Sequence, residues 1–180
     1  MATAAEPATE HAVTDIVAGI AGHIVDISAL FKKYSPDIFR FALYLCGDWH
    51  EAEDITSETF VRAWTTPDRI EAATVKAYLF TIARNLFLQE LRKKPRRAEL
   101  AEQLHDPQPD PEMQAGQKAE LQSVLAKLQT LPEIDRTALL MRSLEGMPYE
   151  EIARTLAIPV TTAKVKVHRA RLLLSEIRNL

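Results

Sequence analysis

Apolar residues recur at helical spacing along most of this chain. The clearest stripe lies near the C-terminal end, where the intervals are 4, 3, 4 and 3: Ala163, Val167, Ala170, Leu174 and Ile177. A second stripe has intervals of 4, 3 and 4: Val75, Leu79, Ile82 and Leu86. Such spacing places the residues on one face of an α-helix. Both stripes therefore predict long amphipathic helices.

Breaks in the pattern predict where other helices begin. Pro36 interrupts one helical pattern, and we expect a new helix to start there with Ser35 as its N-cap. Asp48, followed three residues later by Glu51, resembles a capping box that opens the next helix. The helices predicted in this way cover about residues 35–46, 49–64, 72–94, 113–128 and 160–180.

A segment rich in proline and acidic residues divides the chain. Pro107, Pro109 and Pro111 lie in it, and this composition is typical of an extended, flexible linker. Glycine is scarce, at five residues, which favours helices over the many turns of an all-β fold. We therefore expect an all-α fold with two small helical domains. The expected parts are an N-terminal extension at 1–25, domains at 26–97 and 119–180, and the linker at 98–118.

The C-terminal segment has the pattern of a helix-turn-helix. A short helix ends before Ile158-Pro159, and a longer basic helix follows. Packing its apolar stripe inward groups five basic residues on its other faces: Lys164, Lys166, His168, Arg169 and Arg171. Such side chains can reach DNA phosphates and base edges. The alternative is a solvated basic face on a three-helix bundle, but the clustering on one helix favours DNA binding.

Charge is distributed unevenly along the chain. The formal net charge is −3, yet the run Arg92-Lys93-Lys94-Pro95-Arg96-Arg97 is strongly basic between acidic flanks. Cations suit the C-terminus of a helix, and Pro95 is expected to close it. The cluster exceeds what a cap needs, so we interpret it as a phosphate contact.

Several classes of protein are excluded or disfavoured. Cys46 is the single cysteine, so no intramolecular disulfide can form, and a buried apolar role is expected for it. We find no signal peptide and no apolar run able to span a membrane. The chain has no phosphate-binding glycine loop, no nucleophile elbow and no histidines at metal-binding spacing. We therefore expect no enzyme, no metal and no cofactor, and a cytoplasmic location.

Three motifs in order carry a family resemblance. Residues 47–64, with Glu-Asp-Ile-Thr-Ser-Glu-Thr-Phe-Val-Arg-Ala-Trp, closely resemble region two of bacterial sigma factors. Residues 76–85 are similar to the promoter-melting segment, and Leu131-Pro132 with residues 149–171 resemble region four. The chain therefore resembles the extracytoplasmic-function (ECF) subgroup of the sigma-70 family over about 27–97 and 120–178.

The resemblance implies three sets of site residues. The set for core RNA polymerase is Asp54, Glu58, Phe60, Arg62 and Trp64. The set for the minus-ten promoter DNA is Lys76, Tyr78, Arg84, Asn85, Arg92 and Lys93, and the loop 65–74 would hold an extruded base. The set for the minus-thirty-five DNA is Thr161, Thr162, Lys164, Val165, Lys166, His168, Arg169 and Arg171. The family also implies an anti-sigma factor as a partner in a bacterial cytoplasm.

Four positions depart from the family pattern. Ser57 stands where glutamine is usual, and Gln89 where aspartate is common. Ala157 replaces a glycine in the helix-turn-helix turn, and Val165 replaces a small polar residue. The last two affect the promoter sequence that is read rather than DNA binding. The alternative function is a helix-turn-helix regulator, or a sigma mimic that sequesters a partner without polymerase.

Overall fold

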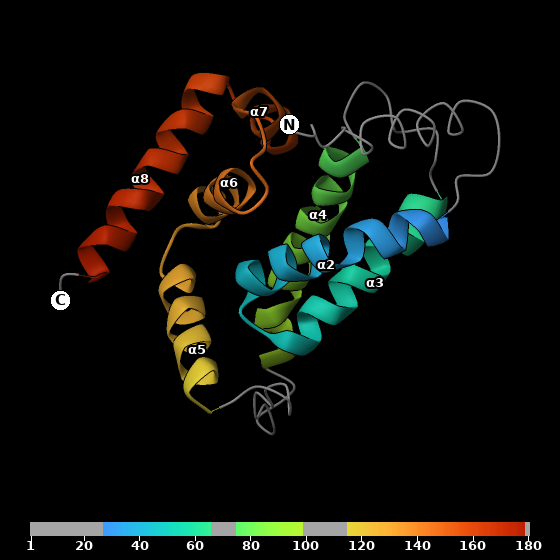
Figure 1. Ribbon diagram of the computed structural model, residues 1–180, viewed down its shortest axis with the longest axis horizontal. Coiled ribbons are helices and arrows are strands. Elements are labelled where there is room, and N and C mark those ends of the chain that lie inside the picture. Colours follow the sequence, from blue (N-terminus) through green and yellow to red (C-terminus); the bar gives the residue numbers. More distant parts are fainter. Residues whose placement is uncertain (1–26, 66–74, 99–114, 179–180) are drawn as a thin grey trace, which may run out of the picture.

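The computed structural model describes residues 27–65, 75–98 and 115–178, and this part of the chain contains seven α-helices and no strand (Figure 1). The helices are α2 (Ile27–Cys46), α3 (Trp49–Thr65), α4 (Val75–Ala98), α5 (Ala115–Gln129), α6 (Glu133–Ser143), α7 (Tyr149–Leu156) and α8 (Val160–Arg178). The predicted all-α class is confirmed. The expected extension, the base-holding loop from residue 66 and most of the linker lie outside the described residues.

Helices α2, α3 and α4 form a first helical group. Their buried residues include Ile38 and Phe41 of α2, Phe60 of α3 and Phe80 of α4. The rings of Phe41 and Phe80 meet edge to face with centroids 4.7 Å apart, a favourable geometry for aromatic pairs. These contacts hold the long helix α4 across the other two.

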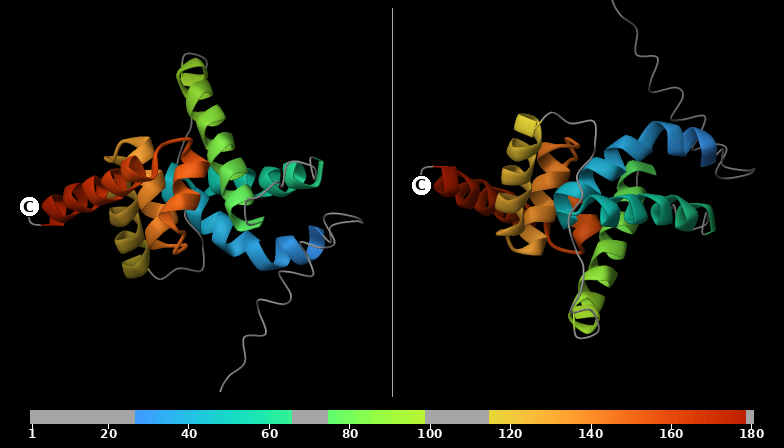
Figure 2. Two further views of the ribbon diagram at one scale, coloured as in Figure 1. Left: turned by 90° about the horizontal axis from the view of Figure 1, so that it is seen from above. Right: turned by 90° about the horizontal axis from the view of Figure 1, so that it is seen from below.

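The prediction that Pro36 separates two helices is wrong. Helix α2 continues through Pro36, and its ribbon bends partway along (Figure 2). Proline removes one hydrogen bond and crowds the preceding turn, so it kinks a helix. Leu30 and Tyr34 before the proline and Ile38 after it are all buried, and this continuous packing keeps both halves helical.

A local signal predicts the start of α3 correctly but the end of α4 wrongly. The Glu51 backbone N–H donates to Asp48 Oδ1 over 2.7 Å, so the predicted N-cap of α3 is confirmed. The prediction that Pro95 ends α4 is wrong, because the helix extends to Ala98. A proline so near a helix end removes only one interior hydrogen bond, which a long helix tolerates.

Helices α5 to α8 form a second helical group, in which α7 and α8 are the predicted helix-turn-helix. Ala163, Val167 and Ala170 of α8 are buried against the group, as their spacing predicted. Ala157 ends α7 with φ 53° and ψ 45°, the left-handed conformation that favours glycine. The Ile158 N–H donates to the Ala153 carbonyl over 3.0 Å, which closes the turn.

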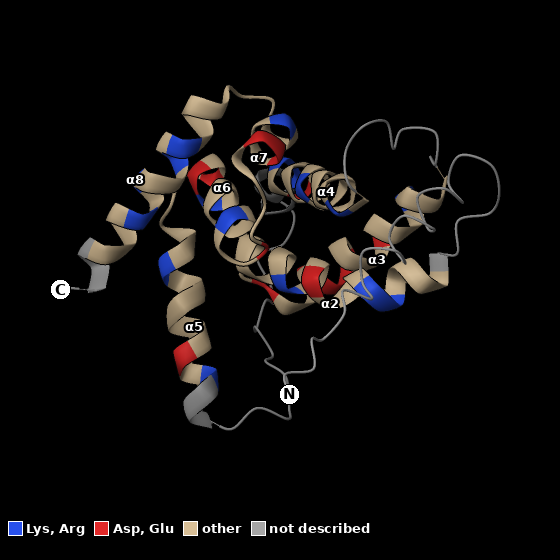
Figure 3. Cartoon of the chain, turned by 45° about the horizontal axis from the view of Figure 1, so that its top comes forward, with Lys and Arg blue, Asp and Glu red and all other residues tan. Residues whose placement is uncertain are grey.

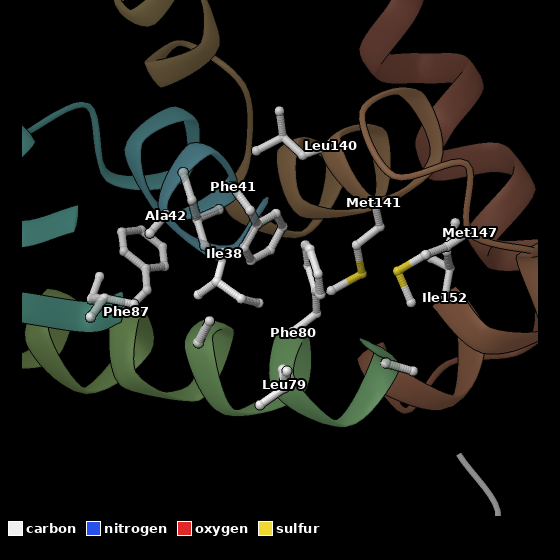
Figure 4. Packing of buried hydrophobic residues seen from close by; sticks show 14 of the residues in the cluster. Ile38, Phe41, Ala42, Leu79, Phe80, Phe87, Leu140, Met141, Met147 and Ile152 are labelled. Atoms are coloured by element: carbon white, nitrogen blue, oxygen red, sulfur yellow. The ribbon is translucent and has the colours of Figure 1, made fainter. Parts of the chain in front are cut away.

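The two helical groups share one apolar core. Phe41 and Phe80 of the first group lie in a row with Met141, Met147 and Ile152 of the second (Figure 4). Helix α8 lies on the side of the second group that faces away from the first (Figures 1 and 2). The chain is therefore closed on itself through α2, α4, α6 and α7.

A side chain of the second group also completes the end of α2. Gln129 Nε2 donates to the carbonyls of Tyr44 and Leu45 over 3.3 and 3.4 Å, groups that have no partner within the helix. Gly47 follows with φ +77°, and a Cβ there would lie 3.0 Å from Gln129 Nε2. Only glycine fits this approach without strain.

The left-handed residue of the helix-turn-helix generates a stability prediction. Replacing Ala157 with glycine should raise the free energy of unfolding by about 0.5–1 kcal/mol, because the steric penalty at positive φ disappears. Urea denaturation followed by circular dichroism measures this. The control is Ala119→Gly on the exposed face of α5, which should lower stability by about 1 kcal/mol. Equal effects of the two changes would contradict the assignment of strain to Ala157.

Candidate nucleic-acid interface

Helix α8 presents a basic face to solvent (Figure 3). Lys164, His168 and Arg171 are exposed on it, as expected from the sequence. Val165 is 61% exposed beside them, and an apolar contact there suits a thymine methyl group. Of the two threonines at the start of the helix, Thr161 is exposed and Thr162 half-buried. Apart from Arg171, these side chains lie on the N-terminal half of α8.

Two cations of the same helix form ion pairs with a buried carboxylate of α6. The side chain of Asp135, on α6, is 0% exposed; its Oδ1 lies 3.0 Å from Lys166 Nζ and its Oδ2 3.3 Å from Arg169 Nε. A buried carboxylate is costly unless it is compensated by cations. Asp135 therefore fixes Lys166 and Arg169 relative to α6. Arg169 still leaves 58% of its side chain exposed, whereas Lys166 leaves 24%.

The predicted minus-ten residues divide into two sets on α4. Asn85, Arg92 and Lys93 are exposed, and Lys93 Nζ lies 2.6 Å from Glu90 Oε1. Lys76, Tyr78 and Arg84 are half-buried. The remaining residues of the basic run, from 94 to 97, have side chains outside the described part of the chain.

Lys76 and Arg84 bind acidic residues of the second helical group. Lys76 Nζ lies 2.9 Å from Glu145 Oε2, and Arg84 Nε lies 3.0 Å from Glu133 Oε1. Arg40 of α2 shares Glu145 at 3.0 Å, and this hydrogen bond raises the pKa of Arg40 above its usual range. Lys76 and Arg84 are thus paired with carboxylates of the same chain.

Helix α3 carries the predicted polymerase contacts. Asp54 is exposed, and Arg62 Nε donates to Glu58 Oε1 over 2.8 Å. Trp64 is 67% exposed. Phe60 is 4% exposed and meets Phe31 edge to face at 4.9 Å, so its ring belongs to the core. Exposed tryptophan beside acidic groups is typical of a protein-binding surface.

Sequence reasoning missed five residues that shape these surfaces. Val61, 52% exposed, lies one helical turn from Trp64 and extends its apolar area. The other four are Arg40, Glu133, Asp135 and Glu145. No local pattern marks such residues, because their roles come from partners distant in the chain. Only Val61 had a signal in the sequence, because it is apolar yet lies outside the core stripe of α3.

One further arginine is structural. Arg136 is buried in α6, donates to Gln129 Oε1 and to the Leu128 carbonyl, and lies 5.6 Å from the centroid of the Phe87 ring. Burial is the main cause that lowers the pKa of Arg136. The Arg136 side chain thus connects α6 with α5 and α4. Among the described residues no group of three or more histidine, cysteine or carboxylate side chains could hold a metal ion.

Comparison with protein families identifies both helical groups. Residues 30–97 match the model for sigma-70 region 2, and residues 121–174 match the model for sigma-70 region 4. Within the described residues no helix is long and apolar enough to cross a membrane. The two matches span α2 to α4 and α5 to α8.

Curated proteins similar to this chain are named as ECF RNA polymerase sigma factors. The ECF RNA polymerase sigma factor EcfG of Rhodopseudomonas palustris is 35% identical over 145 residues, which cover 79% of each protein. The ECF RNA polymerase sigma factor SigE of Mycolicibacterium smegmatis is 32% identical over 147 residues. That match covers 79% of this chain and 57% of SigE.

A solved structure of another sigma factor is similar in fold. The sigma factor RpoE of Bartonella quintana, crystallised in complex with the anti-sigma factor NepR, superimposes with a TM-score of 0.72 and 27% identity. The superposition covers 87% of this chain and 99% of that one. The arrangement of helices is therefore shared between the two.

The buried carboxylate of α6 generates a prediction. Asp135→Asn should lower the free energy of unfolding by about 1–3 kcal/mol, because Lys166 and Arg169 lose the charge that compensates them. Chemical denaturation measures the change. Asp54→Asn removes an exposed carboxylate and should change stability by less than about 0.5 kcal/mol. If the two variants are equally stable, the ion pairs of Asp135 contribute nothing to the fold.

Proposed function

This chain belongs to the ECF family of RNA polymerase sigma factors, and we propose that it is an alternative sigma factor that binds core polymerase, recognises the minus-ten and minus-thirty-five elements and helps to melt the promoter. The observation that carries the proposal is the presence of both sigma-70 regions, each with its own exposed functional face. Sigma factors direct catalysis that belongs to the polymerase, so the chain is not an enzyme, as expected from its sequence.

We assign the polymerase contact to α3. Its exposed face combines the carboxylates of Asp54 and Glu58 with the apolar surface of Val61 and Trp64. Carboxylates attract and orient a basic partner surface, and a large exposed aromatic ring supplies most of the binding energy of such a contact. Phe60 supports this face from beneath, through the core, and Arg62 holds Glu58.

We assign the DNA contacts to α4 and α8. On α8, Lys164, Val165, His168 and Arg171 would enter the major groove of the minus-thirty-five element, with Arg169 beside them. On α4, aromatic and cationic side chains suit the bases and phosphates of a single strand. The minus-ten residues are those predicted from the sequence: Lys76, Tyr78, Arg84, Asn85, Arg92 and Lys93.

The same proposal implies the partners and the location. Core polymerase and promoter DNA place the chain in a bacterial cytoplasm, and no cofactor is required. An anti-sigma factor is a further expected partner, supported by the relative that was crystallised with one. The domain limits that we propose are 26–97 and 119–180.

Run-off transcription tests the function directly. Purified chain and core polymerase, incubated with fragments of the source genome, should yield transcripts that start at defined sites and that core polymerase alone does not make. A chain that binds DNA tightly, yet never associates with polymerase and never directs a transcript, would be a conventional helix-turn-helix regulator instead.

The exposed tryptophan of α3 generates a sharper prediction. Trp64→Ala should weaken binding to core polymerase by roughly ten- to a hundredfold, because a central aromatic contact contributes about 2 kcal/mol or more. Fluorescence anisotropy of labelled chain measures the affinity. The control is Val124→Ala, which shortens a 42% exposed apolar side chain on α5. An unchanged affinity for Trp64→Ala would remove α3 from the polymerase contact.

A further inference from the structure

One buried carboxylate of the second helical group joins two cations of the first. The Glu145 side chain, in the loop between α6 and α7, is 1% exposed. Its Oε1 lies 3.0 Å from Arg40 Nη2 on α2, and its Oε2 lies 2.9 Å from Lys76 Nζ on α4. Two cations from different helices thus converge on one anion. Without Glu145, α2 and α4 would present a ready anion-binding position.

Arg84 forms a second such position, about two helical turns further along α4. Its Nε and Nη2 donate to the two carboxylate oxygens of Glu133 over 3.0 and 3.2 Å. A guanidinium uses this two-pronged geometry for carboxylates and for phosphates alike. Thr137 Oγ1 donates to Glu133 Oε1 over 2.9 Å and holds the carboxylate in place.

Apolar packing closes the space between the two positions. Lys76, Phe80 and Arg84 follow one another at intervals of four residues, so they lie on the same face of α4. Phe80 is fully buried; Met141 of the second group lies beside it, and Met147 and Ile152 lie beyond Met141 (Figure 4). This face of α4 is therefore covered by α6 and α7, whereas Asn85, Arg92 and Lys93 remain exposed.

We propose that Glu145 and Glu133 occupy two phosphate-binding positions of the first helical group, one formed by Arg40 with Lys76 and the other by Arg84. The closed chain and single-stranded DNA bound along this face of α4 then exclude each other. The inference rests on the proposed function, since the ligand is the phosphodiester backbone of an opened promoter strand. It adds Arg40 to the DNA contacts and assigns Lys76 and Arg84 to phosphates rather than bases.

The exchange of ionic ligands is nearly balanced, so the apolar core that the two groups share keeps the free chain mostly closed. Opening the chain breaks ion pairs to carboxylates, and DNA re-forms them with phosphate oxygens of the same charge and acceptor chemistry. Free chain that is mostly closed binds DNA with an apparent affinity reduced by the fraction that is open.

Binding of a fluorescent single-stranded oligonucleotide to the full chain tests the proposal. The variant Glu133→Gln/Glu145→Gln should bind about tenfold tighter than the native chain, because the open fraction rises. In this variant, Arg40→Gln should weaken binding several-fold, as loss of a phosphate contact requires. In the native chain the same Arg40→Gln change should have little effect, because it removes a contact and loosens the closure together.

Matched controls separate closure from net charge. The variant Glu120→Gln/Glu150→Gln removes the same number of carboxylates from exposed positions of the second group, so its affinity measures the effect of charge alone. Glu133→Gln by itself, at a partly exposed residue that keeps its hydrogen bond to Thr137, provides a milder variant should the double change disturb the fold. Circular dichroism verifies that each variant is helical.

A distance measurement reports the closure itself. Spin labels at Ser57→Cys on α3 and Leu172→Cys on α8, both exposed positions, should give a single narrow distance distribution in the native chain. Adding the oligonucleotide, or the change Glu133→Gln/Glu145→Gln, should shift the distribution to longer distances. The exposed control variant should leave it unchanged.

The outcomes distinguish the inference from the function. Equal oligonucleotide affinities for the double variant and its charge control, or DNA binding without a change in distance, would overturn the inference while promoter-dependent transcription stood. Failure of every chain to direct transcription would instead overturn the proposed function, whatever the distances show. Tighter binding of the double variant, dependent on Arg40 and accompanied by longer distances, would support exclusive occupancy.

Discussion

The closed form of this protein depends on one buried carboxylate. Glu145 brings a negative charge from the second helical group into contact with Arg40 and Lys76, at 3.0 and 2.9 Å. A carboxylate so deeply buried is tolerable only while both cations are present. The apolar row around Phe80 supplies attraction without direction, whereas the ion pairs fix how the two groups meet. The proposed DNA contacts use the same cations, so on that proposal architecture and function compete for them.

Local signals in the sequence predicted most of the helices, and long-range packing decided the rest. Asp48 caps α3 as its spacing to Glu51 indicated, because a cap needs only neighbouring residues. Pro36 and Pro95 led to two wrong helix ends. Buried residues on both sides of Pro36 outweigh the loss of one hydrogen bond there, and the long helix before Pro95 tolerates the same loss near its end. Propensity is a weak guide wherever tertiary contacts oppose it.

The candidate site likewise contains features that local patterns predict and features that only long-range packing determines. The exposed cations of α8 follow from the apolar stripe alone, because burying Ala163 and Val167 leaves few faces for them. Periodicity could not reveal that Phe60 is buried while Trp64 is 67% exposed, as both fall on the same broad side of α3. Nor could it reveal that Glu145 lies against Lys76, a residue 69 positions away. Pairings of this kind exist only once the chain has folded.

The ion pairs of Asp135 bear on how promoter preference can diverge during evolution. Loss of either Lys166 or Arg169 removes one of the two cations that compensate a fully buried carboxylate, so substitutions there carry a folding cost. Lys164, Val165, His168 and Arg171 are exposed and can vary without disturbing the interior. On the proposed assignment of this face to the minus-thirty-five element, new promoter sequences are more accessible through these four positions. Duplicated copies of this protein would diverge along one strip of α8 while the strip beside it stays constant.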